Sequence, residues 1–311
     1  MQNLNVRDSI LKFISTIPKP VSVKAYGSSI AFQSGYKENE KKQVDLIVIV
    51  DDIKEFYNKN LKMNGYMYKL IPKMYFRCAK SKNLRKHASI CYTSHIKYDN
   101  NEYKMGVIEK KDVLDDLLNW KTFYIAGRFQ KEMFTAISDE EIEKANLINR
   151  KNALVVALLL LDKENPTLED LYEKICSLSY MGDSRKSFKA EDPNKVKKLA
   201  SGSKDYFDKE YTEKTDLFTV KKDGVLKIND DKLMKAMKEL PSGLYEEIRS
   251  SITPIMSKED VRSTIRMVIV EYLTDIISSS SKGQTMKGIL TTGPLNSISY
   301  ALAKLKKGRK K

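Results

Sequence analysis

The feature that most constrains the fold is a glycine-serine turn followed by an apolar segment that carries one carboxylate. Residues 21–25 predict a β-strand, Gly27 and Ser28 predict a tight turn leading into a helix, and residues 44–50, VDLIVIV, predict a second strand. Glycine and backbone N–H groups at such a turn let phosphate oxygens approach closely, and Asp45 can hold a divalent cation beside them. The pattern predicts a nucleoside triphosphate site, with an ordinary turn and edge strand as the alternative.

Longer motifs continue this pattern through most of the chain. In chain order they include VDLIVIVDD at 44–52, KMGVI at 104–108, DLLNWKTFYIAGR at 116–128, LSYMGDSR at 178–185 and QTMKGI at 284–289. Together they resemble the Tam41 family, the mitochondrial-type phosphatidate cytidylyltransferases. The resemblance implies an enzyme that converts CTP and phosphatidic acid into CDP-diacylglycerol and pyrophosphate with Mg²⁺, on the phosphatidylglycerol and cardiolipin branch of phospholipid synthesis.

The resemblance also implies which residues carry the chemistry. Phosphatidate is already an anionic nucleophile, so the protein has to position and neutralise phosphates rather than supply a strong base. The predicted catalytic residues are Asp45, Asp183 and Lys104, and the two aspartates are also the predicted Mg²⁺ ligands. The predicted nucleotide contacts are Tyr26, Gly27, Ser28, Ser29 and Arg185. The predicted contacts of the phosphatidate phosphate are Arg128 and Lys287.

The second metal carboxylate is the least obvious of these residues. Many nucleotidyltransferases carry a second aspartate two positions along the strand, but this chain has Ile47 there. Asp51 shares the same face but lies roughly 20 Å further along an extended strand. We therefore expect Asp183 to be the second ligand, because Gly182 permits a tight approach and Arg185 can neutralise phosphate. A surface aspartate-arginine pair at a helix end is the alternative.

Length and composition indicate a folded protein of two or more domains. The chain has 311 residues, of which 41% are hydrophobic. We expect an α+β fold with a nucleotidyltransferase-like catalytic domain over 1–125, a mainly helical domain over 126–240 and a helical region over 241–311. The alternating segment around Asp223 and Gly224 predicts a β-hairpin at 219–228, in an arrangement resembling a winged helix. The serines at 278–281 predict a loop.

Charge and hydropathy point to an anionic membrane surface. The net charge of +15 attracts polyanions, although scattered lysines are expected to be solvated. Lys131 is also expected to be a solvated charge, with contact to the triphosphate or the lipid phosphate as the alternative. No apolar run reaches the roughly 20 residues of a membrane span, and the longest ends at Asp162. Apolar residues at 295, 298, 302 and 305 predict a C-terminal amphipathic helix with a basic end, which would lie on the membrane or, alternatively, pack in a core.

These features predict a peripheral membrane protein. Residues 1–17 lack the features of a signal or transit peptide, so we expect the cytoplasmic face of a bacterial membrane, or the matrix side of the mitochondrial inner membrane if a presequence is missing. Two other functions remain open: a nucleotidyltransferase-fold protein acting on RNA or protein, and a non-catalytic membrane-associated assembly factor. The basic tail and the motifs favour the lipid enzyme, and nucleic acid is not an expected partner.

Overall fold

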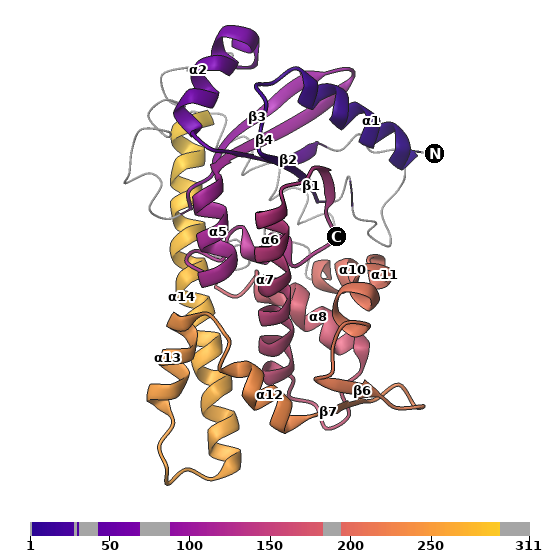
Figure 1. The fold of residues 1–311 in the computed structure, drawn as a ribbon, viewed down its shortest axis with the longest axis vertical. Coiled ribbons are helices and arrows are strands. Elements are labelled where there is room, and N and C mark those ends of the chain that lie inside the picture. The colour runs from indigo at the N-terminus through magenta and orange to yellow at the C-terminus, as the bar shows by residue number, and fades with distance from the viewer. Residues whose placement is uncertain (1, 28–29, 31–42, 69–87, 183–193, 293–311) are drawn as a thin grey trace.

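A mixed five-stranded sheet forms the N-terminal half of the molecule (Figure 1). The computed structural model describes residues 2–27, 30, 43–68, 88–182 and 194–292. The strands are β1 (Ser22–Tyr26), β2 (Val44–Val50), β3 (Cys91–Tyr98), β4 (Asn101–Glu109) and β5 (Phe134–Ile137), in the spatial order β3-β4-β2-β1-β5. β2 pairs with β4 in parallel, and the other three pairings are antiparallel. The fold is therefore α+β, as expected.

Alternate residues of β2 face two different cores. Leu46 and Val48 pack with helices α1 (Gln2–Ser15) and α2 (Ile53–Asn64), whereas Ile47 and Ile49 face α5 (Lys110–Asn119) and α7 (Glu140–Leu160). Figure 1 shows the two pairs of helices on opposite sides of the sheet. Strand residues two apart share a face, so Asp45 lies on the same face as Ile47, toward α5 and α7.

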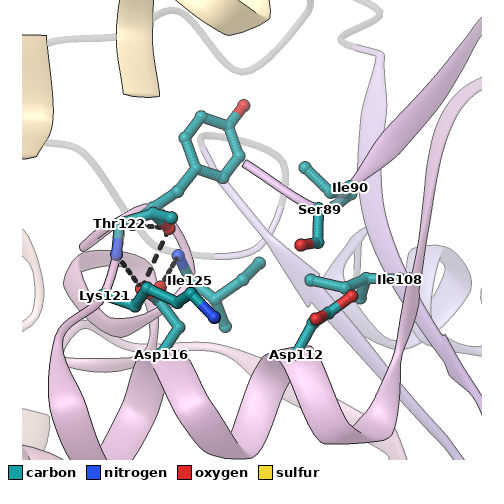
Figure 2. Close-up of a pocket in the computed structure, with 9 residues that line it drawn as sticks. Ser89, Ile90, Ile108, Asp112, Asp116, Lys121, Thr122 and Ile125 are labelled. Atoms are coloured by element: carbon teal, nitrogen blue, oxygen red, sulfur yellow. Dashed lines mark hydrogen bonds between the residues drawn. The ribbon is translucent and has the colours of Figure 1, made fainter. Parts of the chain in front are cut away.

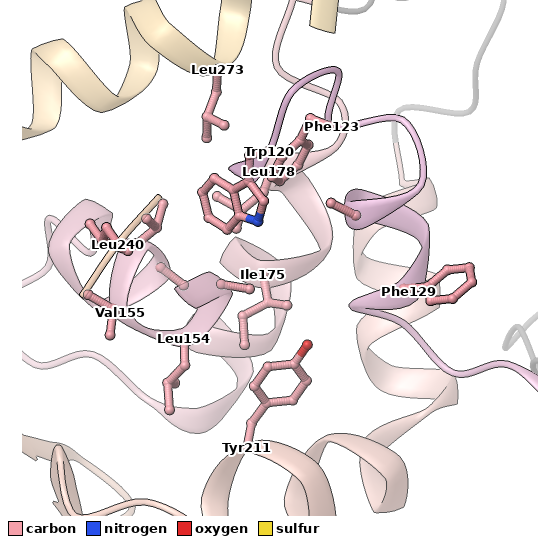
Figure 3. Close-up of a cluster of buried hydrophobic side chains, with 14 of the residues drawn as sticks. Trp120, Phe123, Phe129, Leu154, Val155, Ile175, Leu178, Tyr211, Leu240 and Leu273 are labelled. Carbon is pink, nitrogen blue, oxygen red and sulfur yellow. The ribbon is translucent and has the colours of Figure 1, made fainter. Parts of the chain in front are cut away.

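The second half of the chain is mainly helical and shares one apolar core with the sheet. Figure 3 shows Trp120, Leu178 and Leu273 in this core, although they come from distant parts of the chain. Two short elements precede this half in the chain, η1 (Gly65–Tyr68) after α2 and α6 (Ala126–Phe129) after α5. The remaining elements are α8 (Leu168–Leu178), α10 (Lys195–Gly202), α11 (Lys204–Phe207), η2 (Asp208–Thr212), β6 (Phe218–Val220), β7 (Leu226–Ile228), α12 (Asp230–Met237), α13 (Ser242–Ser251) and α14 (Lys258–Thr292).

The predicted hairpin is confirmed, since β6 and β7 pair in antiparallel fashion around Gly224, whose φ is +83°. The predicted loop at 278–281 is wrong, because these serines lie inside α14. This helix buries Ile269, Leu273 and Ile277 at helical spacing, and Ser280 donates to the Ile277 carbonyl at 3.1 Å. Within the described ranges, no helix is both long and apolar enough to cross a bilayer.

Candidate active site

The turn after β1 and the carboxylate on β2 meet at one end of the sheet. Tyr26 pairs with Asp45 across the β1–β2 ladder, and Gly27 then turns the chain with a φ of +88°. A Cβ atom at position 27 would lie 3.3 Å from Asp45 Oδ2. Only a glycine leaves the carboxylate and the backbone of the turn this close without strain, since a positive φ disfavours other residues. The Asp45 side chain is 29% exposed, so a ligand can reach it.

Among the described residues, Lys104 forms the ion pair with this carboxylate. The parallel β2–β4 register places Lys104 beside Asp45, with its Nζ 3.5 Å from Oδ1. The ammonium group also lies 4.4 Å from the centre of the Tyr92 ring. Cations over an aromatic face gain about 0.5–1 kcal/mol at exposed sites. The structure thus brings Gly27, Asp45 and Lys104 together at one place.

Three tyrosines connect this group to Arg128. The Tyr26 and Tyr92 hydroxyls are 3.1 Å apart, and the Tyr124 hydroxyl donates to that of Tyr92 at 3.5 Å. The Arg128 guanidinium lies 3.7 Å from the centre of the Tyr124 ring and 5.7 Å from that of Tyr26. Burial raises the pKa of Tyr26, against the opposite influence of Lys104, so this phenol stays neutral at pH 7.

The segment that carries Tyr124 and Arg128 is held by one buried carboxylate (Figure 2). Asp116 Oδ1 accepts from the N–H groups of residues 122 and 123 at 2.6 and 2.8 Å and from the Thr122 hydroxyl at 2.9 Å. Its Oδ2 accepts from the N–H groups of residues 125 and 126 at 2.7 and 3.0 Å. From the other side, Asn149 on α7 accepts from the Trp120 indole at 2.9 Å. The two residues fix a loop whose backbone would otherwise lack partners.

The pocket beside Asp116 is too small to be the substrate site. It measures about 10 Å³ and is lined by residues of β4, α5 and the 121–125 loop, with Ser89 and Ile90 opposite (Figure 2). A volume of this size holds at most one water molecule. This pocket therefore leaves the open side of Asp45 as the candidate binding surface.

Gly106 makes room for the tyrosines and was missed by the sequence analysis. It pairs with Tyr92 across the β3–β4 ladder, and a Cβ at position 106 would lie 2.5 Å from Tyr92 Cε1. The ring of Tyr92 therefore crosses the strand at the glycine. The glycine inside the KMGVI strand was the available signal, because glycine in a strand often marks a close approach of another group.

Several predicted site residues lie outside the described part of the chain. They are Ser28, Ser29, Asp183 and Arg185, whereas Lys287 belongs to α14 with a side chain that is likewise not described. Their roles stay predictions. Ile47 is fully buried and Asp51 is exposed just beyond the end of β2, so neither lies beside Asp45 as a second ligand.

One expectation about this region is wrong. Lys131 is not a freely solvated charge, since its ammonium donates to Ser179 Oγ and lies 4.6 Å from the centre of the Tyr180 ring. The backbone at Gly182 packs closely against helix α14, because a Cβ there would lie 2.4 Å from the Thr274 carbonyl oxygen. The absence of a side chain at 182 is therefore used in helix packing.

Asp45 is suited to bind a magnesium ion together with substrate. Among the described residues, no three or more histidine, cysteine, aspartate or glutamate side chains form a metal cluster. Mg²⁺ does not require such a cage, because it commonly binds one or two carboxylates plus phosphate oxygens and water. An exposed aspartate oxygen beside a glycine turn offers this donor set.

Comparison with known proteins agrees with the motifs. A family model described as mitochondrial phosphatidate cytidylyltransferase matches residues 10–307. A protein of Schizosaccharomyces pombe with that name is 30% identical over 97% of this chain and 84% of its own length. The Bos taurus protein of the same name is 30% identical, covering 95% of this chain and 93% of its own length. A Dictyostelium discoideum protein, again of this name, is 29% identical over 92% of the chain and 81% of its own length.

The family match covers almost the whole chain and includes Gly27, Asp45, Lys104 and Arg128, the residues that the sheet and its loops gather at one end. The chain belongs to the Tam41 family of phosphatidate cytidylyltransferases, and it is an enzyme of CDP-diacylglycerol synthesis.

Proposed function

We propose that this chain transfers CMP from CTP to phosphatidic acid in a Mg²⁺-dependent reaction. A phosphate oxygen of phosphatidate attacks the α-phosphorus of CTP, the bond from that phosphorus to the bridging oxygen breaks, and pyrophosphate leaves with the bonding electrons. The products are CDP-diacylglycerol and pyrophosphate. The observation that carries the proposal is the convergence of Gly27, Asp45 and Lys104, which suits a metal-bound triphosphate.

Each residue has a role that needs no general base. The backbone at Gly27 approaches the phosphates, Asp45 holds the cation, and Lys104 neutralises charge that develops on the phosphate oxygens. Arg128, which has no carboxylate partner in the described chain, binds the phosphate of phosphatidate. The magnesium ion, when bound, supplies electrophilic stabilisation of the triphosphate. Ser28, Ser29, Asp183, Arg185 and Lys287 stay predicted contacts of the nucleotide, the metal and the lipid phosphate.

The test is transfer of label from CTP to lipid. Purified protein is incubated with Mg²⁺, phosphatidate vesicles and CTP labelled in either the α- or the γ-phosphate. Label from the α-position should enter the lipid and label from the γ-position should enter pyrophosphate. Transfer to RNA or protein instead of lipid would support the first alternative function, and the absence of any nucleotide binding would support a non-catalytic role.

A pair of aspartate variants ties this activity to the site. Asp45→Asn should lower the rate of transfer by about 100-fold or more. Mutation of residues that only hydrogen-bond to a metal ligand already lowers metal affinity or activity by about 10- to 100-fold. Asp51→Asn is the matched control, because Asp51 is exposed beyond the end of the same strand. Equal activity of the two variants would remove Asp45 from the site.

We further propose that the enzyme works as a peripheral protein on the matrix side of the mitochondrial inner membrane and serves the phosphatidylglycerol and cardiolipin branch. Support comes from the mitochondrial names of the relatives and from the basic amphipathic pattern at the C-terminus. Residues 294–311 lie outside the described part of the chain. Their deletion should weaken sedimentation with anionic vesicles at low salt, and unchanged sedimentation would contradict membrane binding by this segment.

A further inference from the structure

A second cationic cluster lies next to Arg128. Lys131 follows Arg128 by three residues, and its ammonium donates to Ser179 Oγ at the end of α8. The same ammonium lies 4.6 Å from the centre of the Tyr180 ring, and the Lys195 ammonium at the start of α10 lies 5.2 Å from that ring. Three separate elements thus place two ammonium groups and a hydroxyl around one tyrosine.

A glycine allows this cluster to form. Gly127 is buried in α6, and a Cβ there would lie 2.6 Å from Ser179 Cβ. Real Cβ contacts are essentially never this short, so an alanine would push α6 away from the end of α8. The close packing of these two helices holds Lys131 against Ser179. The cluster is therefore built by the fold.

The charge of Lys131 is not compensated within the described chain. Burial lowers the pKa of its ammonium, and the nearby cations Lys195 and Arg128 lower it further. Neither Lys131 nor Arg128 has a carboxylate within ion-pair distance in the described residues. Other buried cations differ, since Lys24 pairs with Glu143 and Arg150 pairs with Glu210.

A desolvated cation without a counter-ion costs free energy unless a ligand neutralises it. Lys131 and Arg128, which have no carboxylate partner among the described residues, are neighbours, and Arg128 connects through the tyrosines to Asp45. An anion arriving at Lys131 would satisfy both the ammonium and the Ser179 hydroxyl. Lysine binds phosphate as a point charge with three donors, and it suits a phosphate monoester of charge near −2.

We infer that Lys131 and Ser179, flanked by Tyr180 and Lys195, bind the phosphate monoester of the lipid acceptor. The inference rests on the proposed function, in which the triphosphate occupies the turn beside Asp45. The reaction brings two phosphate-bearing molecules together, and the nucleotide is held at the Gly27 end. The Lys131 cluster, which neighbours Arg128, is then the place for the second phosphate.

The test separates acceptor binding from nucleotide binding in the full chain. Lys131→Met removes the charge, Lys131→Arg keeps it, and Ser179→Ala removes the hydroxyl. Lys151→Met is the matched control, because Lys151 is an exposed lysine whose partner is Glu239 on the surface. For each protein, the KM for soluble dihexanoyl phosphatidate, the Kd for CTP with Mg²⁺ and no acceptor, and the melting temperature are measured.

Lys131→Met should raise the KM for phosphatidate about tenfold or more, the usual size of a lost charge-assisted hydrogen bond. Its Kd for CTP should stay within about twofold, and its melting temperature should not fall, because the cation has no carboxylate partner among the described residues. Lys131→Arg should recover part of the lost affinity, and Ser179→Ala should show a smaller rise in KM.

Three results would overturn the inference. The first is a tenfold weaker Kd for CTP with an unchanged KM for phosphatidate, which would assign Lys131 to the triphosphate. The second is no change in either constant for Lys131→Met and Ser179→Ala. The third is a lower melting temperature with both affinities reduced equally, which would mean a structural role. If the wild-type protein makes no CDP-diacylglycerol, the proposed function fails, while direct binding of dihexanoyl phosphatidate still tests the cluster.

Discussion

Replacement of Asp116 by asparagine tests how the active-site loop is held. The aspartate accepts three hydrogen bonds on one oxygen and two on the other, all from residues 122–126. Asparagine has a single acceptor oxygen, and its NH₂ group would face at least two backbone N–H donors. Each buried donor left without a partner costs about 1–3 kcal/mol, so we expect a loss of roughly 2–6 kcal/mol. The total free energy of unfolding of a domain is typically about 5–15 kcal/mol, so this loss would be a large part of it.

The measurement is urea unfolding of the full chain, with Asp115→Asn as the matched control. Asp115 is the preceding residue on α5, and its partners Lys121 and Asn119 lie at the surface. Exposed pairs of this kind contribute about 0–1 kcal/mol. Asp116→Asn should also lower kcat/KM, because the loop carries Tyr124 and Arg128. Equal stability of the two variants would refute the idea that the carboxylate fixes this loop.

Two further substitutions have clear expected results. Gly106→Ala should cost about 1–3 kcal/mol in urea unfolding and lower activity, because the new methyl group displaces the Tyr92 ring, whereas Gly65→Ala, with open space around it, should be near neutral. Burial acts to raise the pKa of Asp170, but hydrogen bonds led by that from Lys163 outweigh it and lower the pKa below 3.8. The stability that ionised Asp170 contributes is therefore present above pH 3.8 and lost as the pH falls through its lowered pKa. Asp170→Asn should consequently reduce the loss of unfolding free energy between pH 5 and pH 3. A loss equal to that of the wild-type protein would contradict this.

Local patterns predicted the elements that depend on nearby residues. Strand β2 spans 44–50 as expected, because an apolar run between polar turns has one favourable assignment. Thr167 and Asp170, three residues apart, form a capping box at the start of α8, and the Asp-Gly pair gives the predicted hairpin of β6 and β7. In each case the signal lies within a few residues of the structure that it specifies.

Elements that depend on distant partners were missed. Strand β5 has four residues, all of them at least partly exposed, and it forms only because β1 offers a free edge. Strand β3 likewise begins only at Cys91, where its pairing with β4 begins. In the same way, the sheet and the Asp116 loop bring the Tyr92 and Tyr124 hydroxyls together, with Arg128 over the Tyr124 ring, and no sequence spacing links Tyr92 to Tyr124.

The length of α14 has a mechanical consequence. Its 35 residues, Lys258–Thr292, span about 52 Å. Tyr272 packs against Gly243 on α13, and Gln284 donates to the Ile90 carbonyl just before β3 at 3.1 Å. Figure 1 shows the helix running beside both halves of the molecule. A hinge motion between the halves would break contacts of α14 at several points at once. We therefore expect substrates to enter through small side-chain movements around Asp45 rather than by domain opening.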